Sequence, residues 1–410
     1  MIEYYFERPH AIARMRSVCT GAHIDAFADA LTALGYTRNG GRALLRGVTH
    51  LGAWLDANEF DISALDEPML KKFVAGIKEQ SAGEGKPRHC HAGGLRFLNW
   101  ARERSVVSTS PPVPPEPELL REFIEWMRHQ RNLAEATIKG YRLPLRRFVA
   151  ELGDDPSRYA AADIRRFVLR ESQRAGRGYA QLAVSALRMF FRYLAIGGQV
   201  GPELVDAVPS IANWALASLP MHLRPAEVEQ LIGACDPDTP CGSRDRAMIL
   251  LMAVLGLRSG DLVQLRLGDI DWKTATLSLS GKSRTASRLP LPQEAGDALL
   301  YWITTGRSEH PNDDNRVFLR MRPPIGPITN VAVYNVVAAA AKRAGLEAPR
   351  VGPRMLRHSA ATSLLRQGAS LPTIGAVLRH RSIDTTAIYA KVDIDLLASI
   401  AQPWPEEGSP

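Results

Sequence analysis

Apolar residues recur every three to four positions through the first two hundred residues, the spacing that lines one face of an α-helix. The pattern occurs twice, in the same order, and predicts two copies of a small helical bundle. The corresponding pairs of segments are 24–41 with 120–137, 65–74 with 159–168, and 93–104 with 185–196. Because any two helical bundles share this period, common ancestry of the two modules stays open.

Beyond residue 221 the pattern changes. An apolar helix ends at Gly256, which we expect in the left-handed conformation, and Ser259 is expected to cap the helix after it. Residues 274–280 alternate, turn at Gly281 and return over 287–292, which predicts a β-hairpin. Helical spacing then returns in four segments, 328–344, 355–367, 371–379 and 383–391. The predicted fold class is mainly α, with helical-bundle N-terminal domains and a small antiparallel β-sheet in the C-terminal domain.

Two segments predict domain boundaries in a chain of 410 residues, which is too long for one ordinary core. Five prolines between residues 105 and 118 favour an extended spacer. A softer boundary lies within 197–210. The predicted organisation is an N-terminal helical domain 1–104, a linker 105–118, a second helical domain 119–200, a linker 201–220 and a C-terminal domain 221–410.

The basic residues are concentrated in one part of the chain. The formal net charge is +8, and residues 121–200 contain fifteen Arg and Lys against eight Asp and Glu. Tyr141, Phe148, Tyr159, Phe167 and Tyr179 are interleaved with them. A local surplus of this kind indicates a polyanionic partner such as nucleic acid. The alternative is an arginine-rich solvated surface.

Other site classes find little support in the sequence. Four cysteines, and the His-Cys-His run at 89–91, lack the spacing of a disulfide framework or a zinc site, so no metal is expected. There is no apolar run of about eighteen residues and no signal peptide, so we expect a soluble, cytoplasmic protein without membrane association.

Four stretches of the C-terminal half form a set, namely 255–271, 281–292, 354–365 and 377–389. They present Arg258, Lys282, Arg357, His380 and Tyr389 in that order. In this order and spacing the chain resembles the tyrosine recombinase (phage integrase) family. The resemblance covers 221–393 by motif, and 119–200 more loosely as that family's core-binding domain. The ending after Tyr389 is similar to that of transposon-borne members.

The residue types suit transesterification at a phosphodiester, because two guanidiniums can neutralise a pentacoordinate phosphorus without a metal. The resemblance implies that Arg258 and Arg357 clamp the phosphate and that Tyr389 attacks it, giving a 3′-phosphotyrosyl bond. We expect the arginines to favour the phenolate. Lys282 would protonate the departing 5′-oxygen, a role that Arg284 could share. His380 would contact a phosphate oxygen or brace the arginines.

One position departs from the family pattern, which has a histidine three residues before the second arginine. Arg354 stands there, and an arginine cannot accept a proton. We include Arg354 among the candidate catalytic residues as a phosphate contact. His358 follows Arg357 by about 100° round a helix and is expected to point elsewhere. The alternative is that His358 replaces the missing base.

The sequence therefore predicts a site-specific DNA recombinase or integrase, independent of metal, ATP and cofactors. Its expected partners are double-stranded DNA, further copies of itself in dimers and a DNA-bound tetramer, and companion recombinases. Leu396, Leu397 and Ile400 fit an anchor on a neighbouring protomer or an intramolecular cap about equally. Two alternatives remain, a catalytically silent DNA-binding accessory member and a relaxing enzyme resembling type IB topoisomerases.

Overall fold

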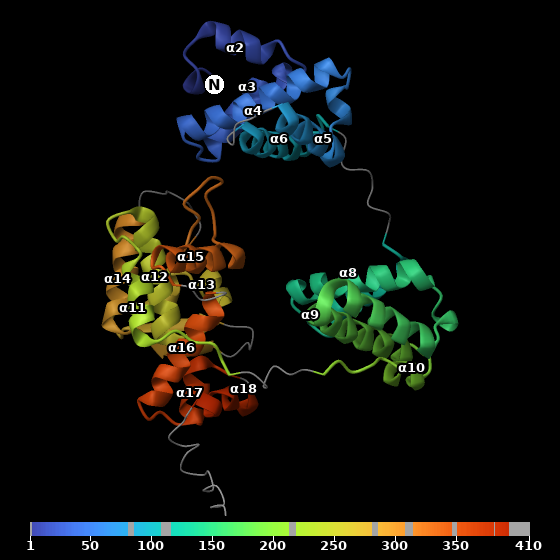
Figure 1. Cartoon of the computed structure of the whole chain (residues 1–410), viewed down its shortest axis with the longest axis vertical. Helices are drawn as coiled ribbons and strands as arrows, with labels where there is room; N and C mark the ends of the chain where they lie inside the picture. Colours follow the sequence, from blue (N-terminus) through green and yellow to red (C-terminus); the bar gives the residue numbers. More distant parts are fainter. Residues whose placement is uncertain are drawn as a thin grey trace, which may run out of the picture. The chain divides into compact units, whose positions relative to one another are not determined.

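The computed structural model describes residues 2–80, 86–107, 116–212, 219–280, 286–307, 315–346, 351–380 and 382–392. It forms two compact units (Figure 1), one of Arg102–Ala215 and one of Met1–Ala101 with Leu216–Pro410. Most described residues are helical, with a single three-stranded antiparallel sheet among them, which confirms the predicted fold class. No helix in the described ranges combines the length and the apolar character that crossing a membrane requires.

The N-terminal hundred residues form a helical bundle whose apolar faces meet around Phe27, Leu45, Leu51 and Phe97, all buried. Thr37 begins the longest of these helices by accepting a hydrogen bond from the backbone N–H of Gly40. The elements in chain order are α1 Ile2–Tyr5, α2 Pro9–Arg16, α3 Gly21–Ala33, α4 Arg38–Ala57, the 3₁₀ turn η1 Ile62–Ala64, α5 Glu67–Gln80 and α6 Lys86–Glu103.

The unit Arg102–Ala215 repeats the order of the elements from α3 to α6. It contains α7 Glu118–His129, α8 Glu135–Leu152, the 3₁₀ turn η2 Pro156–Arg158, α9 Ala161–Ile196 and α10 Pro202–Asp206. Gly176, with φ of 78° and ψ of 174°, interrupts α9, so that its two halves correspond to α5 and α6. Both 3₁₀ turns begin with an aspartate, Asp61 or Asp155, that accepts from the N–H of the serine two residues on. The shared order supports the predicted repeat, whose ancestry remains a prediction.

The core of this second unit extends past the predicted boundary at residue 201. Helix α10 packs on α9, and Leu204 and Val208 are buried among the same side chains as Phe148 and Phe190. The first part of the predicted linker 201–220 is therefore a helix of the core. Its apolar residues were too few to show a helical period in the sequence.

The C-terminal region contains the remaining elements. In chain order they are α11 Pro225–Gly233, α12 Pro240–Leu255, α13 Ser259–Gln264, the 3₁₀ turn η4 Leu267–Asp269, β1 Ile270–Asp271, β2 Thr276–Ser280, β3 Ala286–Pro290, α14 Gln293–Tyr301, the π-helical turn η5 Trp302–Gly306, α15 Asn330–Arg343, α16 Pro353–Arg366, α17 Leu371–Leu378, α18 Ile383–Ala387 and the 3₁₀ turn η6 Ile388–Val392. The four predicted helices after residue 328 are present, with Tyr389 in η6.

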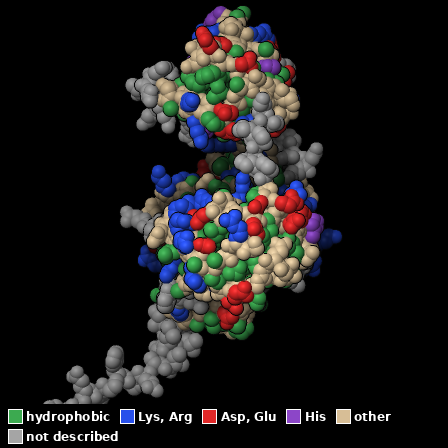
Figure 2. Space-filling model, turned by 90° about the vertical axis from the view of Figure 1, so that its right-hand side faces the viewer, with side chains coloured by type: hydrophobic (Ala, Val, Ile, Leu, Met, Phe, Trp, Pro, Cys, Tyr) green, Lys and Arg blue, Asp and Glu red, His purple; other side chains and the backbone are tan. Residues whose placement is uncertain are grey.

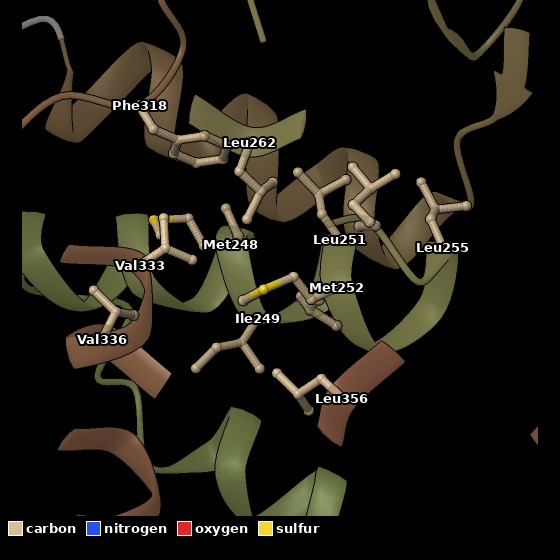
Figure 3. Packing of buried hydrophobic residues seen from close by; sticks show 14 of the residues in the cluster. Met248, Ile249, Leu251, Met252, Leu255, Leu262, Phe318, Val333, Val336 and Leu356 are labelled. Carbon is tan, nitrogen blue, oxygen red and sulfur yellow. The ribbon is translucent and has the colours of Figure 1, made fainter. Parts of the chain in front are cut away.

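Helix α12 lies at the centre of this region and is buried nearly all round. Its side chains pack against α13, α15 and α16 (Figure 3), where Met248 and Ile249 lie among Val333, Val336 and Leu356. A helix without a polar face suits the middle of a core. The sheet has strand order β1-β2-β3, and Leu277 of β2 pairs with Leu289 of β3 in the predicted hairpin.

Candidate active site

Helix α16 presents three side chains of the site in its first turns. Arg354, Arg357 and His358 belong to Pro353–Arg366. Residues three or four apart share a face of a helix, so Arg354 neighbours both of the others. Arg354 is exposed, His358 is partly buried and Arg357 is buried. The start of α16 thus carries two guanidiniums and one imidazole toward the same region.

Arg357 is held by the ends of two other helices. Its Nη1 donates to the carbonyl of Gly256, and its Nη2 donates to the carbonyl of Leu378. Gly256 ends α12 in the left-handed conformation that the sequence predicts, with φ of 61°, and Leu378 ends α17. Carbonyls at helix C-termini have negative partial charge and suit a guanidinium. Burial, with Arg258 next in effect, lowers the pKa of Arg357 to about 10, so it stays charged near neutral pH.

Arg258 lies at the start of α13. Its Nη2 donates to the carbonyl of Arg379 over 3.2 Å, which brings it to the end of α17. The expected cap of α13 was Ser259. The structure instead has Asp261 in that role, since its Oδ2 accepts from the backbone N–H of Arg258 at 2.9 Å. The sequence interpretation missed that a carboxylate three residues into a helix can bond back to the residue before it.

His380 follows Arg379 and is bonded on both sides. Its backbone N–H donates to the carbonyl of Gly375, and its Nδ1 lies 2.8 Å from the hydroxyl oxygen of the buried Thr386. The imidazole stacks on the ring of Tyr389 with 6.4 Å between centroids and 5° between planes. Burial and, second, the charge of Arg357 lower the pKa of His380 to about 4. It is therefore neutral near pH 7.

Tyr389 is enclosed rather than exposed. It is 1% exposed and packs with Ala361, Ile374 and Leu378. Burial raises the pKa of its phenol, while the charges of Arg357, Arg354 and Arg258 act in the opposite direction. The arginines favour the phenolate, as expected, but desolvation of the charged form outweighs them, so the pKa of the phenol is raised on balance.

His358 is the residue whose position the sequence interpretation missed. Its Nδ1 lies 2.9 Å from the phenol oxygen of Tyr389, and the Nε of Arg354 donates to its Nε2 over 3.3 Å. The prediction that His358 points elsewhere is wrong. The prediction was based only on the rotation of about 100° between Arg357 and His358. In the structure, η6 packs along α16 and brings Tyr389 to the face that His358 shares with Arg354. The spacing of four between Arg354 and His358 was the available signal.

Several candidate residues lie outside the described part of the chain. Lys282 and Arg284 belong to residues 281–285, between β2 and β3. Leu396, Leu397 and Ile400 follow residue 392. Their predicted roles therefore remain predictions. Among the residues that the structure describes, no group of three or more His, Cys, Asp or Glu side chains could hold a metal ion.

The aromatic residues interleaved with the basic segment are mostly core. Phe148, Tyr159 and Phe167 are buried, so they do not offer a stacking surface. Arg147 and Arg174 bond the buried Glu171 and lie over the ring of Tyr179. Other arginines of this unit pair with carboxylates, including Arg121 with Glu118, Arg128 with Glu135 and Arg142 with Glu116. In Figure 2 blue and red side chains are interspersed over the face shown.

The arrangement brings together side chains that suit phosphoryl transfer. Guanidiniums from α13 and α16, an imidazole after α17 and a tyrosine of η6 come together from distant parts of the chain. Arginines supply charge and bidentate geometry for a phosphate, and a phenol is a nucleophile of the kind that forms a covalent intermediate. The described residues thus form a candidate site of the class that cleaves a phosphodiester by means of a tyrosine.

Comparison with known proteins agrees with this class. Residues 221–395 match the phage integrase family, and residues 120–197 match the phage integrase N-terminal SAM-like domain. The chain is 33% identical over 416 residues to a predicted integrase/recombinase of Sinorhizobium fredii, y4rA, with 99% of this chain and all of that protein covered. It is 31% identical to the tyrosine recombinase XerD of Listeria monocytogenes over 67% of this chain and 94% of XerD. The protein belongs to the phage integrase family of tyrosine recombinases.

Solved structures share its fold at low sequence identity. The post-cleavage complex of XerH recombinase with difH substrate has a TM-score of 0.56 at 21% identity, covering 76% of this chain and 94% of that one. The Tn1549 transposon integrase in complex with transposon right-end DNA has a TM-score of 0.53 at 15% identity, covering 68% and 99%. Membership of the family implies DNA strand-transferase activity in site-specific recombination.

Proposed function

We propose that the protein cuts and rejoins DNA strands through a 3′-phosphotyrosyl intermediate on Tyr389. One observation carries the proposal. The guanidinium of Arg258 bonds the residue before His380 across 121 positions of sequence, and the ring of His380 stacks on Tyr389. Arg357 bonds the carbonyls of Gly256 and Leu378, next to these same segments. Side chains scattered along the sequence thus surround one phenol.

The arginines would bind the scissile phosphate and steady its transition state. A phosphodiester carries one negative charge, and its pentacoordinate form carries about two, so preorganised cations favour the latter. Arg357 suits this role because helix ends hold its guanidinium in place before substrate arrives. Arg258 and Arg354 are exposed and would approach from either side. His380, with Nδ1 engaged by Thr386, would offer Nε2 to a phosphate oxygen.

Proton transfer and energy supply follow from the same chemistry. In our proposal the phenol of Tyr389 loses its proton to water, its oxygen bonds to phosphorus, the 5′-oxygen leaves, and Lys282 gives that oxygen its proton. The phosphotyrosyl ester conserves the energy of the broken bond, so rejoining needs neither ATP nor a metal.

The proposed substrate is double-stranded DNA. The unit Arg102–Ala215, with its surplus of arginine, and the C-terminal region would contact the duplex, and phosphate contacts make such binding fall with salt. Related solved structures include recombinases with difH substrate and with transposon right-end DNA. By analogy with the family we propose two protomers at each site and four in the synaptic complex, with companion recombinases where the element encodes them.

A covalent-adduct assay tests the proposal. The full chain is incubated with a nicked duplex that contains an end of the genetic element carrying its gene, and a denaturing gel detects protein joined to DNA. The wild type should form an adduct and Tyr389→Phe should not. Tyr301→Phe, at an exposed tyrosine of the same region, is the matched control and should behave as the wild type.

One observation favours a second function. Arg354 stands where the family has a proton-accepting histidine, as expected of a catalytically silent, DNA-binding accessory protein. Tight binding of the end sequence without any adduct would support that function and contradict ours. Relaxation of supercoiled DNA regardless of sequence would instead support an enzyme resembling type IB topoisomerases.

A further inference from the structure

We infer that His358 is a positioning residue that donates a hydrogen bond from Nδ1 to the phenol oxygen of Tyr389, and that Arg354 imposes this by donating to Nε2. The inference rests on the proposed role of Tyr389 as nucleophile. Arg354 would then orient His358, whereas the histidine usually found at this position in the family accepts a proton. The two residues together form a chain of donors that ends on the attacking oxygen.

The direction of the hydrogen bonds follows from the chemistry of the three groups. A guanidinium nitrogen can only donate, and Arg354 Nε lies 3.3 Å from His358 Nε2. Nε2 must then accept and be unprotonated, which leaves the single proton of a neutral imidazole on Nδ1. Nδ1 lies 2.9 Å from the phenol oxygen, so the oxygen accepts. The hydrogen bond from Arg354 to Nε2 thus fixes the tautomer of His358, and this tautomer makes Nδ1 a donor to the phenol oxygen of Tyr389.

The surroundings of His358 keep the imidazole neutral. It faces Arg354 and Arg357 on its own helix, His222 from the segment before α11, and Tyr389 on η6. Burial, then the charge of Arg354, lowers its pKa to about 4. A histidine with so low a pKa is a poor base near neutral pH, since it does not hold a second proton. His358 therefore acts as a donor and not as the missing base.

A donor at this place has two consequences for the nucleophile. It turns the phenol's own proton away from His358, because the oxygen already accepts on that side. It also stabilises negative charge as it develops on the oxygen, and so offsets part of the effect by which burial raises the pKa of Tyr389. A histidine at position 354 could accept as well as donate and would not impose one tautomer on His358. An arginine can only donate, so it imposes the tautomer with an unprotonated Nε2.

Nitrogen NMR on the full chain tests the tautomer without DNA. Protein labelled with ¹⁵N only in histidine is recorded near pH 7, and His358→Asn identifies the signals of residue 358 by their loss. We expect protonated Nδ1 and unprotonated Nε2 in the wild type. In Arg354→Met, which cannot donate, the Nε2–H form should gain population. An imidazolium or a predominant Nε2–H form in the wild type would overturn the inference.

Adduct kinetics test the effect on the nucleophile. His358→Ala should slow adduct formation by about 100-fold, as removal of one preorganised donor does, and leave DNA affinity unchanged. His358→Asn places an amide N–H near the position of Nδ1 and should recover most of the rate. The pH–rate profile of His358→Ala should move to higher pH, because the pKa of Tyr389 rises. Equal loss in both variants, or an unmoved profile, would contradict the inference.

Two controls separate the possible failures. His129→Ala changes an exposed histidine of α7 and should alter neither rate nor profile. Circular dichroism and the urea transition show whether His358→Ala is folded, and His358→Asn carries the test if it is not. A wild type that forms no adduct contradicts the proposed function, while the NMR result decides the tautomer independently.

Discussion

Asp261 and Arg379 form a buried ion pair across 118 positions of sequence. Their side chains are 8% and 9% exposed. Asp261 also accepts from the backbone of Arg258, and Arg379 directly precedes His380. Arg379 has φ of 55°, a left-handed conformation that is uncommon outside glycine. The pair therefore connects the segment of Arg258, a candidate phosphate-binding arginine, to the segment of His380, a candidate phosphate-binding histidine.

Asp261→Asn should destabilise the C-terminal region by about 3–5 kcal/mol, because it leaves the buried guanidinium of Arg379 without a counter-charge. The asparagine keeps an oxygen for the backbone of Arg258, so the loss reports mainly on the ion pair. Urea denaturation measures it, and adduct formation should fall in parallel. Glu118→Gln, which removes an exposed pair with Arg121, is the control and should change stability little. Similar stability of the two variants would contradict a structural role for Asp261.

Gly256→Ala should weaken both stability and catalysis. Its φ of 61° disfavours a side chain by about 1–2 kcal/mol, and an added Cβ would lie 2.5 Å from Cδ2 of Leu378. The carbonyls of Gly256 and Leu378 both accept hydrogen bonds from Arg357, so the guanidinium of Arg357 should shift as well. Gly233→Ala, in α11 with no atom within 4 Å of an added Cβ, is the matched control and should be neutral or slightly stabilising. Thermal denaturation and adduct rates measure the difference, and equal effects of the two changes would contradict this role.

Thr386→Val should reduce activity while it preserves shape. Valine matches threonine in volume but leaves Nδ1 of His380 without its partner at 2.8 Å, so the imidazole can rotate away from the site. Misplacement of a catalytic group by about 1 Å lowers reaction rates by roughly ten- to a hundredfold. The adjacent Thr385 is exposed, and Thr385→Val should leave the adduct rate unchanged. If Thr386→Val reacts as fast as the wild type, His380 needs no such support.

Stability should fall as pH decreases from about 6.5 to about 4. The folded chain holds the pKa of His358 and of His380 at about 4, below the ordinary value near 6.5. Between these values the unfolded chain binds more protons, so the stabilisation is complete above pH 6.5 and is lost as pH falls through the folded pKa. Urea midpoints at pH 7 and pH 5 measure the slope. His358→Asn with His380→Gln should flatten it, and an unchanged slope would contradict the assignment.

Resemblance to the tyrosine recombinase family, based on the order and spacing of its motifs, predicted much of the candidate site. The positions of Arg258, Arg357, His380 and Tyr389 could be chosen in the sequence, and the structure brings these residues together. The sequence did not reveal which groups support them. Thr386 gains its role only because α18 packs on α17, which brings its hydroxyl to His380. His358 is one of ten histidines in the sequence, and only the fold places Tyr389 against it.

By itself the sequence determined the helical periods, the hairpin, the glycine that ends α12 and the order of the reactive side chains. These depend on residues within a few positions of one another, where backbone geometry sets the distances. Only the tertiary structure decided that Tyr389 is enclosed, that Arg379 pairs with Asp261 and that His358 meets the phenol. Each of these depends on which faces of α16, α17 and η6 pack together, and packing is a property of the whole core, not of any local stretch.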